Sequence, residues 1–375
     1  MSLDRLDLTG IVNANEFYSA DYLAAMLESD LKGLVEGWRA AAEATGARPP
    51  WEKLGALRGA WLQLQTELDE VRDAEERAHA QHEWLARLWS ALGYRIEAQD
   101  AALEGGSVLR LAAAVNRPDG RPEVWLIETA PPPRKSEDAP GPLEQDLPRE
   151  GTAEAVSVEA GLDECIFALA EPPRWVLAAN ARELVLVDRA KWPQRRHLRF
   201  QFSELLTRRD PGTLRAVAAL LHADSLNSPA GACFLDTLEE SSHRHASAVS
   251  EDLKYTAREA IELLGNEAVT YLREVLKEKI YGRDLAAQLT GECLRWLYRL
   301  LFILYVEARR ELRHAPMASD EYRTGYSFET LRDLENLPLS TGEQRDGYYL
   351  DASIKKLFRL YWDGFQAKQL ELEGT

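Results

Sequence analysis

The residue that most directly suggests chemistry in this sequence is Glu128. It follows the apolar run Val124 to Ile127 in the stretch PEVWLIETA, which has the length and composition of a buried strand. A carboxylate at the end of a strand can bind Mg²⁺, and the metal can then activate water for phosphodiester hydrolysis. One carboxylate alone is a weak Mg²⁺ site, and the preceding apolar segment, VLRLAAAV, has no aspartate at its centre.

Acidic residues and an amine in the flanking segments could complete such a site. Glu97 and Asp119 are candidate metal ligands that would have migrated from the usual strand positions, and Lys135 is a candidate displaced amine. An active site built from these groups would require Mg²⁺ as its cofactor. We therefore keep two interpretations of Glu128, a catalytic residue with displaced partners and a residue that has lost its catalytic role.

Basic residues are concentrated in WPQRRHLR and LTRRD, and they form the best candidate DNA-binding surface of the chain. Phosphates are contacted mainly by arginine and lysine, so such a cluster in an acidic protein could position a nucleic acid locally. An equally strong alternative is that these side chains balance the charge of the acidic loop around Glu137 and Glu150. The residues of this cluster are Arg195, Arg196, His197, Arg199, Arg208 and Arg209.

Histidines and cysteines suggest no comparable site. His79 and His82 lie three residues apart, which is a metal-binding spacing on a helix, but no further ligand is near them in sequence. We expect them to lie on a solvated helix face. Cys165, Cys233 and Cys293 are scattered without paired or metal-type spacing, which is typical of reduced, buried thiols in a cytoplasmic protein.

Length and charge exclude several classes of protein. The chain has 375 residues, of which 45% are hydrophobic, enough to fill the cores of two or three domains. A formal charge of −17 argues against a general polyanion-binding protein, so any contact with DNA must be local. No segment resembles an export signal, and the longest apolar run, WLYRLLFILYV, is too short to span a bilayer and predicts a buried helix. We expect no membrane partner.

The pattern of elements predicts an α+β protein that is mainly helical. Residues 1–93 have helical periodicity, and residues 94–210 have strand-like segments around one helix, as expected for a small domain with a mixed sheet. Residues 211–315 are helical again, with Ser250 as an expected helix cap, and residues 316–375 are rich in turns and aromatic side chains. Trp125 and Ile127 are expected in the sheet core.

Two strings resemble a known family. CLRWLYRLLFILYVEARREL, followed by YRTGYSFETLRDL, is similar to the helical segment before the methyltransferase core of type IIG restriction-modification proteins and of DISARM-type adenine-specific DNA methyltransferases. In that family a nuclease-like PD-(D/E)XK domain comes first and a helical connector follows. PEVWLIETA and PRWVLAANARELVLVD fall where the nuclease-like sheet would lie.

The resemblance implies a degenerate nuclease domain. Glu128 matches the metal-binding glutamate, but Ala130 occupies the position of the catalytic lysine, so Glu128 would be a relic. A Gly-containing loop for S-adenosylmethionine and an Asn-Pro-Pro-Tyr type motif are absent, so we expect that cofactor only in a methyltransferase core outside residues 1–375. This chain is then expected to be inactive alone, with no cofactor of its own.

Three functions follow from these observations. The first is a non-methylating module of a restriction-modification or phage-defence methyltransferase, which positions double-stranded DNA or other defence-system subunits. The second is a Mg²⁺-dependent endonuclease module with displaced catalytic residues. The third is a protein-interaction scaffold that does not bind nucleic acid, which the net charge would suit.

Overall fold

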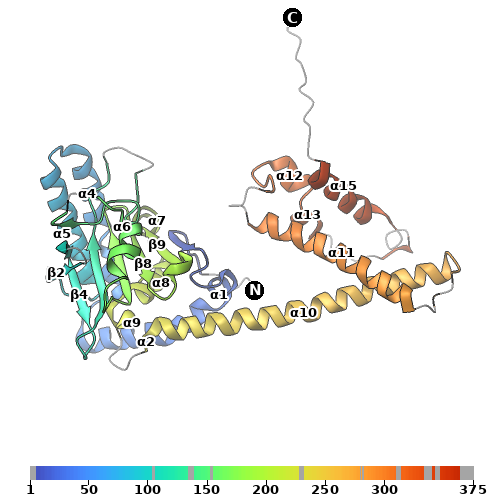
Figure 1. Cartoon of the computed structure of the whole chain (residues 1–375), viewed down its shortest axis with the longest axis horizontal. Helices are drawn as coiled ribbons and strands as arrows, with labels where there is room; N and C mark the ends of the chain where they lie inside the picture. The colour runs from blue at the N-terminus through green and yellow to red at the C-terminus, as the bar shows by residue number, and fades with distance from the viewer. Residues whose placement is uncertain are drawn as a thin grey trace, which may run out of the picture. The chain divides into compact units, whose positions relative to one another are not determined.

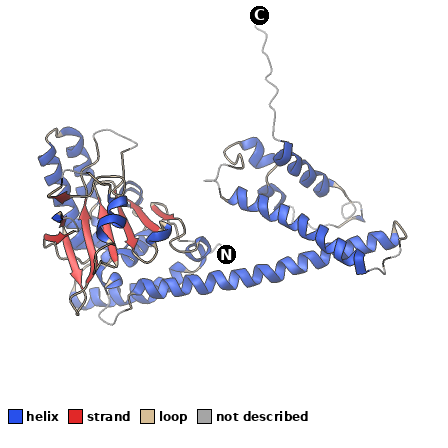
Figure 2. Ribbon diagram, viewed as in Figure 1, coloured by secondary structure: helices blue, strands red, loops and turns tan. Residues whose placement is uncertain are grey.

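The computed structural model has an α+β fold that is mainly helical, as predicted (Figures 1 and 2). It describes residues 6–103, 106–133, 139–152, 155–227, 232–278, 280, 283–309, 314–332, 340–342 and 347–363. The chain divides into two compact units, Met1–Val249 and Ser250–Thr375. No helix in these described ranges is both long and apolar enough to cross a membrane.

The first unit is built on a mixed six-stranded sheet, with strand order β1-β9-β8-β7-β5-β4. β5 and β7 are parallel and are connected through the short helix α6 (Val158–Gly161) and the π-helical turn η2 (Leu162–Ile166), whereas the other neighbours are antiparallel. The strands are β1 (Ile11–Ala14), β4 (Ala113–Asn116), β5 (Pro122–Glu128), β7 (Trp175–Ala179), β8 (Glu183–Asp188) and β9 (His197–Gln201).

Side chains of the central strands alternate between two apolar cores. Leu177 and Ala179 of β7 face the larger core, while Val176 and Ala178 face the smaller one. The sheet is therefore covered on both faces, and this explains why its strands are apolar at nearly every position. Trp125 and Ile127 lie in the smaller core with 5% and 0% of their surface exposed, which confirms their predicted burial.

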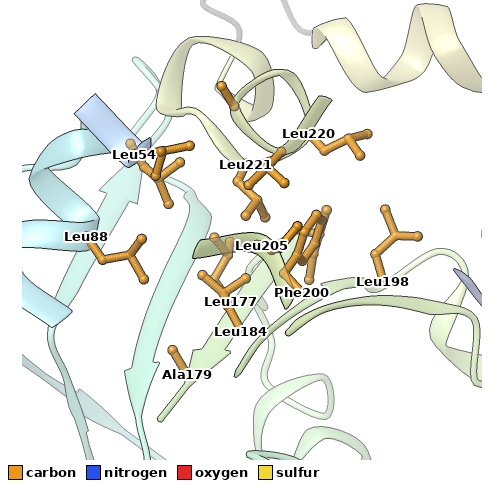
Figure 3. Packing of buried hydrophobic residues seen from close by; sticks show 14 of the residues in the cluster. Leu54, Leu88, Leu177, Ala179, Leu184, Leu198, Phe200, Leu205, Leu220 and Leu221 are labelled. Atoms are coloured by element: carbon orange, nitrogen blue, oxygen red, sulfur yellow. The ribbon is translucent and has the colours of Figure 1, made fainter. Parts of the chain in front are cut away.

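Helices of the first unit form the larger core against the sheet (Figure 3). Leu54 and Leu88 from the N-terminal helices meet Leu177 and Phe200 of the sheet there. Helix starts are well specified, because the side chains of Ser19, Asp73 and Asp210 accept hydrogen bonds from the first-turn backbone of α1, α5 and α8. The helices are α1 (Ala20–Ala25), α2 (Leu27–Thr45), α3 (Pro50–Ala56), α4 (Arg58–Glu70), α5 (Ala74–Ala91), α7 (Phe202–Arg208), α8 (Pro211–Leu221) and α9 (Ala223–Leu226).

Two predictions about the strands were wrong. The first ninety residues are not wholly helical, because β1 adds an edge strand that pairs with β9. The segment SVLRLAAAV, whose composition is typical of a single strand between two turns, is not one strand either. It forms β3 (Val108–Leu111) in a second, three-stranded sheet, passes through Ala112, and continues as β4 in the main sheet. The second sheet also contains β2 (Gln99–Ala102) and β6 (Arg149–Glu150).

Helix α10 (Phe234–Glu274) continues past the boundary between the two units. Ser250 was predicted to cap a new helix, but it lies inside α10. The helix begins at Phe234, sixteen residues before Ser250, so a residue that commonly caps helices is here an interior residue. Placing serine at this interior position costs little free energy, because serine has only a moderately unfavourable helix propensity.

The second unit has a small apolar core of its own, formed by Ile303, Ala315, Met317, Tyr322 and Leu357. Its elements after α10 are α11 (Arg283–Ala308), α12 (Asp320–Gly325), α13 (Phe328–Arg332) and α15 (Tyr349–Asp363).

Helix α11 contains the apolar run that was predicted as a buried helix, but much of that run is on the surface. Ile303 and Val306 are buried, whereas Tyr298 and Phe302 are 67% and 58% exposed. An all-round apolar helix does not reveal from its sequence which face meets the core.

Candidate site at the carboxyl ends of strands β5 and β7

The carboxyl ends of the parallel strands β5 and β7 are the natural place to look for a site, because ligands of open α/β sheets bind outside the carboxyl ends of the strands. Glu128 ends β5 there and pairs in register with Ala179, the last residue of β7. Its side chain is 15% exposed. Glu128 therefore lies at the end of a buried strand, as both interpretations of this residue require.

Both carboxylate oxygens of Glu128 are engaged by helix α5. The Oε2 atom lies 2.6 Å from Nδ1 of His82, and Oε1 accepts a hydrogen bond of 2.9 Å from the indole nitrogen of Trp89. His82 and Trp89 are two helical turns apart and therefore project from the same side of α5. When Glu128 is ionised it can only accept, so the protonated Nδ1 tautomer of His82 is the donor in this pair.

These contacts do not fit a Mg²⁺ site. Magnesium needs oxygen ligands in octahedral geometry, whereas Glu128 meets two N–H donors. Within the described ranges, no group of three or more histidine, cysteine or acidic side chains could hold a metal ion. At the position expected for the catalytic lysine, Ala130 offers only its carbonyl, which accepts a hydrogen bond of 2.9 Å from Gln145.

The candidate partners of Glu128 lie elsewhere or cannot be placed. Asp119 belongs to the turn before β5, so the length of that strand separates it from Glu128, and it accepts a hydrogen bond from the backbone of Arg121 instead. Glu97 is exposed in the segment before β2. Lys135 lies outside the described residues.

A buried polar network closes the ends of β5 and β7 beside Glu128. The amide of Gln81, 2% exposed, donates to the Thr129 carbonyl at 2.7 Å and accepts from the Ala181 N–H at 2.8 Å. The hydroxyl of Thr129 and the amide of Asn180 both donate to Oε1 of Gln145, at 2.5 and 3.0 Å. Side chains thus satisfy backbone groups that a bound ligand or water would otherwise meet.

A hollow of about 770 Å³ lies next to this network, and its walls include Trp61, Gln65 and Arg182. Trp61 and Gln65 both donate hydrogen bonds to the Ala181 carbonyl, at 3.1 and 3.2 Å. Charged groups of both signs line the hollow, among them Asp69, Arg77, Arg182, Glu183 and Glu204. This mixture lacks the excess positive charge that would favour a phosphate.

The arginine cluster predicted from the sequence is divided among local ion pairs. Arg195 pairs with Asp163 at 2.6 Å and stacks over Trp192, and Arg208 pairs with Asp7 at 2.7 Å. These ion pairs support the interpretation that the cluster balances acidic charge. The partners are Asp163 and Asp7, however, and not the predicted Glu137 and Glu150. Glu150 lies 3.8 Å from Arg110, and Glu137 lies outside the described residues.

Arg199 of β9 is also engaged by acidic side chains. Its Nη2 atom lies 2.7 Å from Glu144 and 3.0 Å from Glu183. Burial raises the pKa of Glu183, while the Arg199 guanidinium opposes that rise. This arginine therefore compensates a partly buried acid.

The remaining members of the cluster differ in exposure. Burial lowers the pKa of His197, whose Nδ1 lies 2.9 Å from the Arg195 carbonyl. Arg196 is half-buried, and Arg209 is exposed at the end of α7 with a left-handed backbone (φ 52°). Arg196 and Arg209 are the arginines of this cluster that form no ion pair with the part of the chain that the structure describes.

Sequence reasoning missed the partners of Glu128. His82 is 49% exposed, in agreement with the expected solvated helix face, but its imidazole also contacts a carboxylate 46 positions later, which the sequence did not predict. The seven-residue spacing of His82 and Trp89 indicates a shared helix face, but nothing in the sequence indicates which strand that face meets.

No family model, no curated protein and no solved structure matches this chain.

Proposed function

We propose that this chain is a non-methylating module of a restriction-modification or phage-defence DNA methyltransferase, and that its nuclease-like domain positions DNA or partner proteins without cutting DNA. The sequence resemblance suggests this assignment. A mixed sheet in which an apolar strand ends in Glu128, followed along the chain by a helical unit, is consistent with it.

One observation carries the non-cutting part of the proposal. Glu128 has the expected strand position, but His82 and Trp89 occupy its two oxygens. A metal-dependent nuclease needs the carboxylate free for the ion and a further group to align water. Here the imidazole and indole hold the carboxylate as a structural acceptor, so the glutamate links α5 to the end of β5.

A nicking assay tests this proposal. We expect no conversion of supercoiled plasmid to the nicked form in Mg²⁺ or Mn²⁺, because loss of a catalytic group typically lowers a rate by about a hundredfold or more. The parent and Glu128→Ala should be indistinguishable in this assay. If the parent nicks the plasmid and the variant does not, Glu128 is catalytic and the alternative endonuclease function is correct.

Ion pairing favours a second candidate function, a protein-interaction scaffold without nucleic-acid binding. Arg195, Arg199 and Arg208 are already paired with acids of this chain, so phosphates would have to displace those partners. Titration of the parent with labelled duplex DNA at increasing salt separates the candidates. Salt-dependent binding that is weakened in an Arg195, Arg196 and Arg208 triple alanine variant supports DNA positioning, and absence of binding by the parent supports the scaffold.

A further inference from the structure

Arginines gather at the end of the main sheet opposite to Glu128. Two belong to the tight turn between β4 and β5, where the Arg117 N–H donates to the Arg121 carbonyl at 2.8 Å. Gly120 closes this turn with φ 86°, a conformation that favours glycine, and donates to the Arg117 carbonyl at 2.9 Å. The turn thus holds Arg117 and Arg121 next to each other.

Two further arginines extend the pairing of β7 and β8. Trp175 pairs with Asp188, and the next residues outward are Arg174 and Arg189, joined by a backbone hydrogen bond of 2.9 Å from Arg189 to Arg174. Like charges directly opposite in a strand pair destabilise the sheet. This pair lies beside the first residues of β5, because Val124 pairs with Trp175.

All four arginines line one hollow of about 340 Å³. The other residues that line it are Pro122, Ala170, Glu171 and Pro172. Glu171 is the one acid among these lining residues, against four guanidinium groups. The turn before β5, the segment before β7 and the end of β8 therefore contribute positive charge to the same small volume.

Acidic side chains hold the two inner arginines, and two of these acids, Glu123 and Asp188, are buried. Arg117 forms an ion pair with Glu123, whose side chain is 4% exposed. Arg174 forms an ion pair with Asp236, lies 3.8 Å from Asp188, and stacks over Trp175 with 4.7 Å to the ring centroid. These contacts fix the positions of both guanidinium groups.

The two outer arginines are open to a ligand. Arg121 is 66% exposed, and its Nε lies 3.8 Å from Asp119, beyond hydrogen-bond distance. Arg189 is exposed and forms no ion pair with any residue that the structure describes. The hollow thus combines two cations held by acids with two exposed cations whose donors remain available.

We propose that this hollow is an anion site that binds a phosphate group, with Arg121 and Arg189 as its principal ligands. The planar guanidinium matches two phosphate oxygens at once, so two arginines facing one hollow can enclose a phosphate. The phosphate can belong to a free phosphoester or to a nucleic-acid backbone. The site is independent of the nuclease likeness, because none of its ligands belongs to the Glu128 end of the sheet.

The experiment compares three proteins, each containing all 375 residues, at constant ionic strength. They are the parent, the double variant Arg121→Ala, Arg189→Ala, and a matched control, Arg39→Ala, Arg87→Ala, which removes two exposed arginines of helices α2 and α5. Calorimetry with inorganic pyrophosphate measures the site directly, and anisotropy with a short labelled DNA duplex measures backbone binding. Circular dichroism and thermal unfolding should be the same in all three proteins, because the substituted side chains are exposed.

We expect the parent and the control to bind pyrophosphate, and the site variant to bind it about tenfold more weakly or not at all. If duplex binding falls in the same variant, the natural phosphate belongs to a nucleic acid. If only pyrophosphate binding falls, it belongs to a free phosphoester. A parent that does not bind pyrophosphate, or a control that loses as much affinity as the site variant, would overturn the proposal.

Discussion

Gln81 shows how a single side chain can replace a ligand at the end of a sheet. Its amide joins the backbone of β5, through Thr129, to the turn after β7, through Ala181. Both partners are buried, so neither has water as an alternative. Gln81 is therefore more important for stability than its polar side chain would suggest.

Replacing Gln81 by alanine should lower the free energy of unfolding by about 2–4 kcal/mol, because each unpaired buried backbone group costs about 1–3 kcal/mol. Urea denaturation followed by tryptophan fluorescence would measure this change. Gln65→Ala is the matched control, with an expected loss of about 1 kcal/mol or less, since Trp61 still donates to the Ala181 carbonyl. Equal losses in the two variants would contradict this role for Gln81.

His222 gives the first unit a dependence on pH. Burial lowers the pKa of His222, with Asp224 opposing the shift and Lys53 adding to it. In the unfolded chain its pKa returns to about 6.5, so the unfolded state takes up a proton first as the pH falls. The contribution of His222 to stability is therefore complete above pH 7 and is lost progressively as the pH falls below about 6.5.

We expect the free energy of unfolding of His222→Asn to fall less than that of the parent as the pH is lowered from 7 to below about 6.5. Asparagine keeps the capping function, because its side chain can accept from the Asp224 N–H as Nδ1 of His222 does, over 3.2 Å. Urea denaturation at a series of pH values would measure the difference between the two proteins. Parallel curves for parent and variant would show that His222 does not titrate on unfolding.

At the scale of elements, the sequence predicted strands that are buried and regular. β5, β7 and β8 are continuous apolar runs between turn signals, so the sequence alone predicts that they are strands. β1 could not, because four residues without periodicity become a strand through pairing with β9. The position of Glu128 followed from its strand, whereas its contacts with α5 and the ion pairs of Arg195 and Arg208 depend on tertiary packing.

The turn after β1 should control the stability of this edge strand. The Asn13 amide donates to the Tyr18 carbonyl at 2.7 Å and accepts from the Tyr18 N–H at 3.2 Å. Asn13→Ala should therefore reduce stability by about 1–2 kcal/mol and speed hydrogen exchange of the β9 amides that face β1. Val12→Ala, on the same strand but 41% exposed, should change stability by about 0.5 kcal/mol or less. Unchanged exchange in Asn13→Ala would show that β1 does not need this turn.

At the scale of the whole molecule, the two units have separate apolar cores. The residues of the two cores in the first unit end at Leu238, and the core of the second unit begins at Ile303. Because no buried cluster of the described residues is shared between the units, each should unfold as its own cooperative transition.

We expect calorimetry of the full chain to resolve two transitions, and a fragment of residues 1–249 to reproduce one of them. The fragment keeps both cores of the first unit, so its midpoint should lie close to that of the corresponding transition in the full chain. A single transition in the full chain, together with an unfolded fragment, would show that the units depend on each other.

The passage of the chain from β3 to β4 through Ala112 limits how this protein can change in length during evolution. Leu111 is paired with Gln99 in one sheet, and Ala113 is paired with Leu126 in the other. An insertion or deletion of one residue at Ala112 would shift one strand by one position and turn its apolar side chains to the wrong face. Relatives of this chain should therefore align without gaps across Ala112, and their length differences should fall in turns such as the one from Arg117 to Arg121.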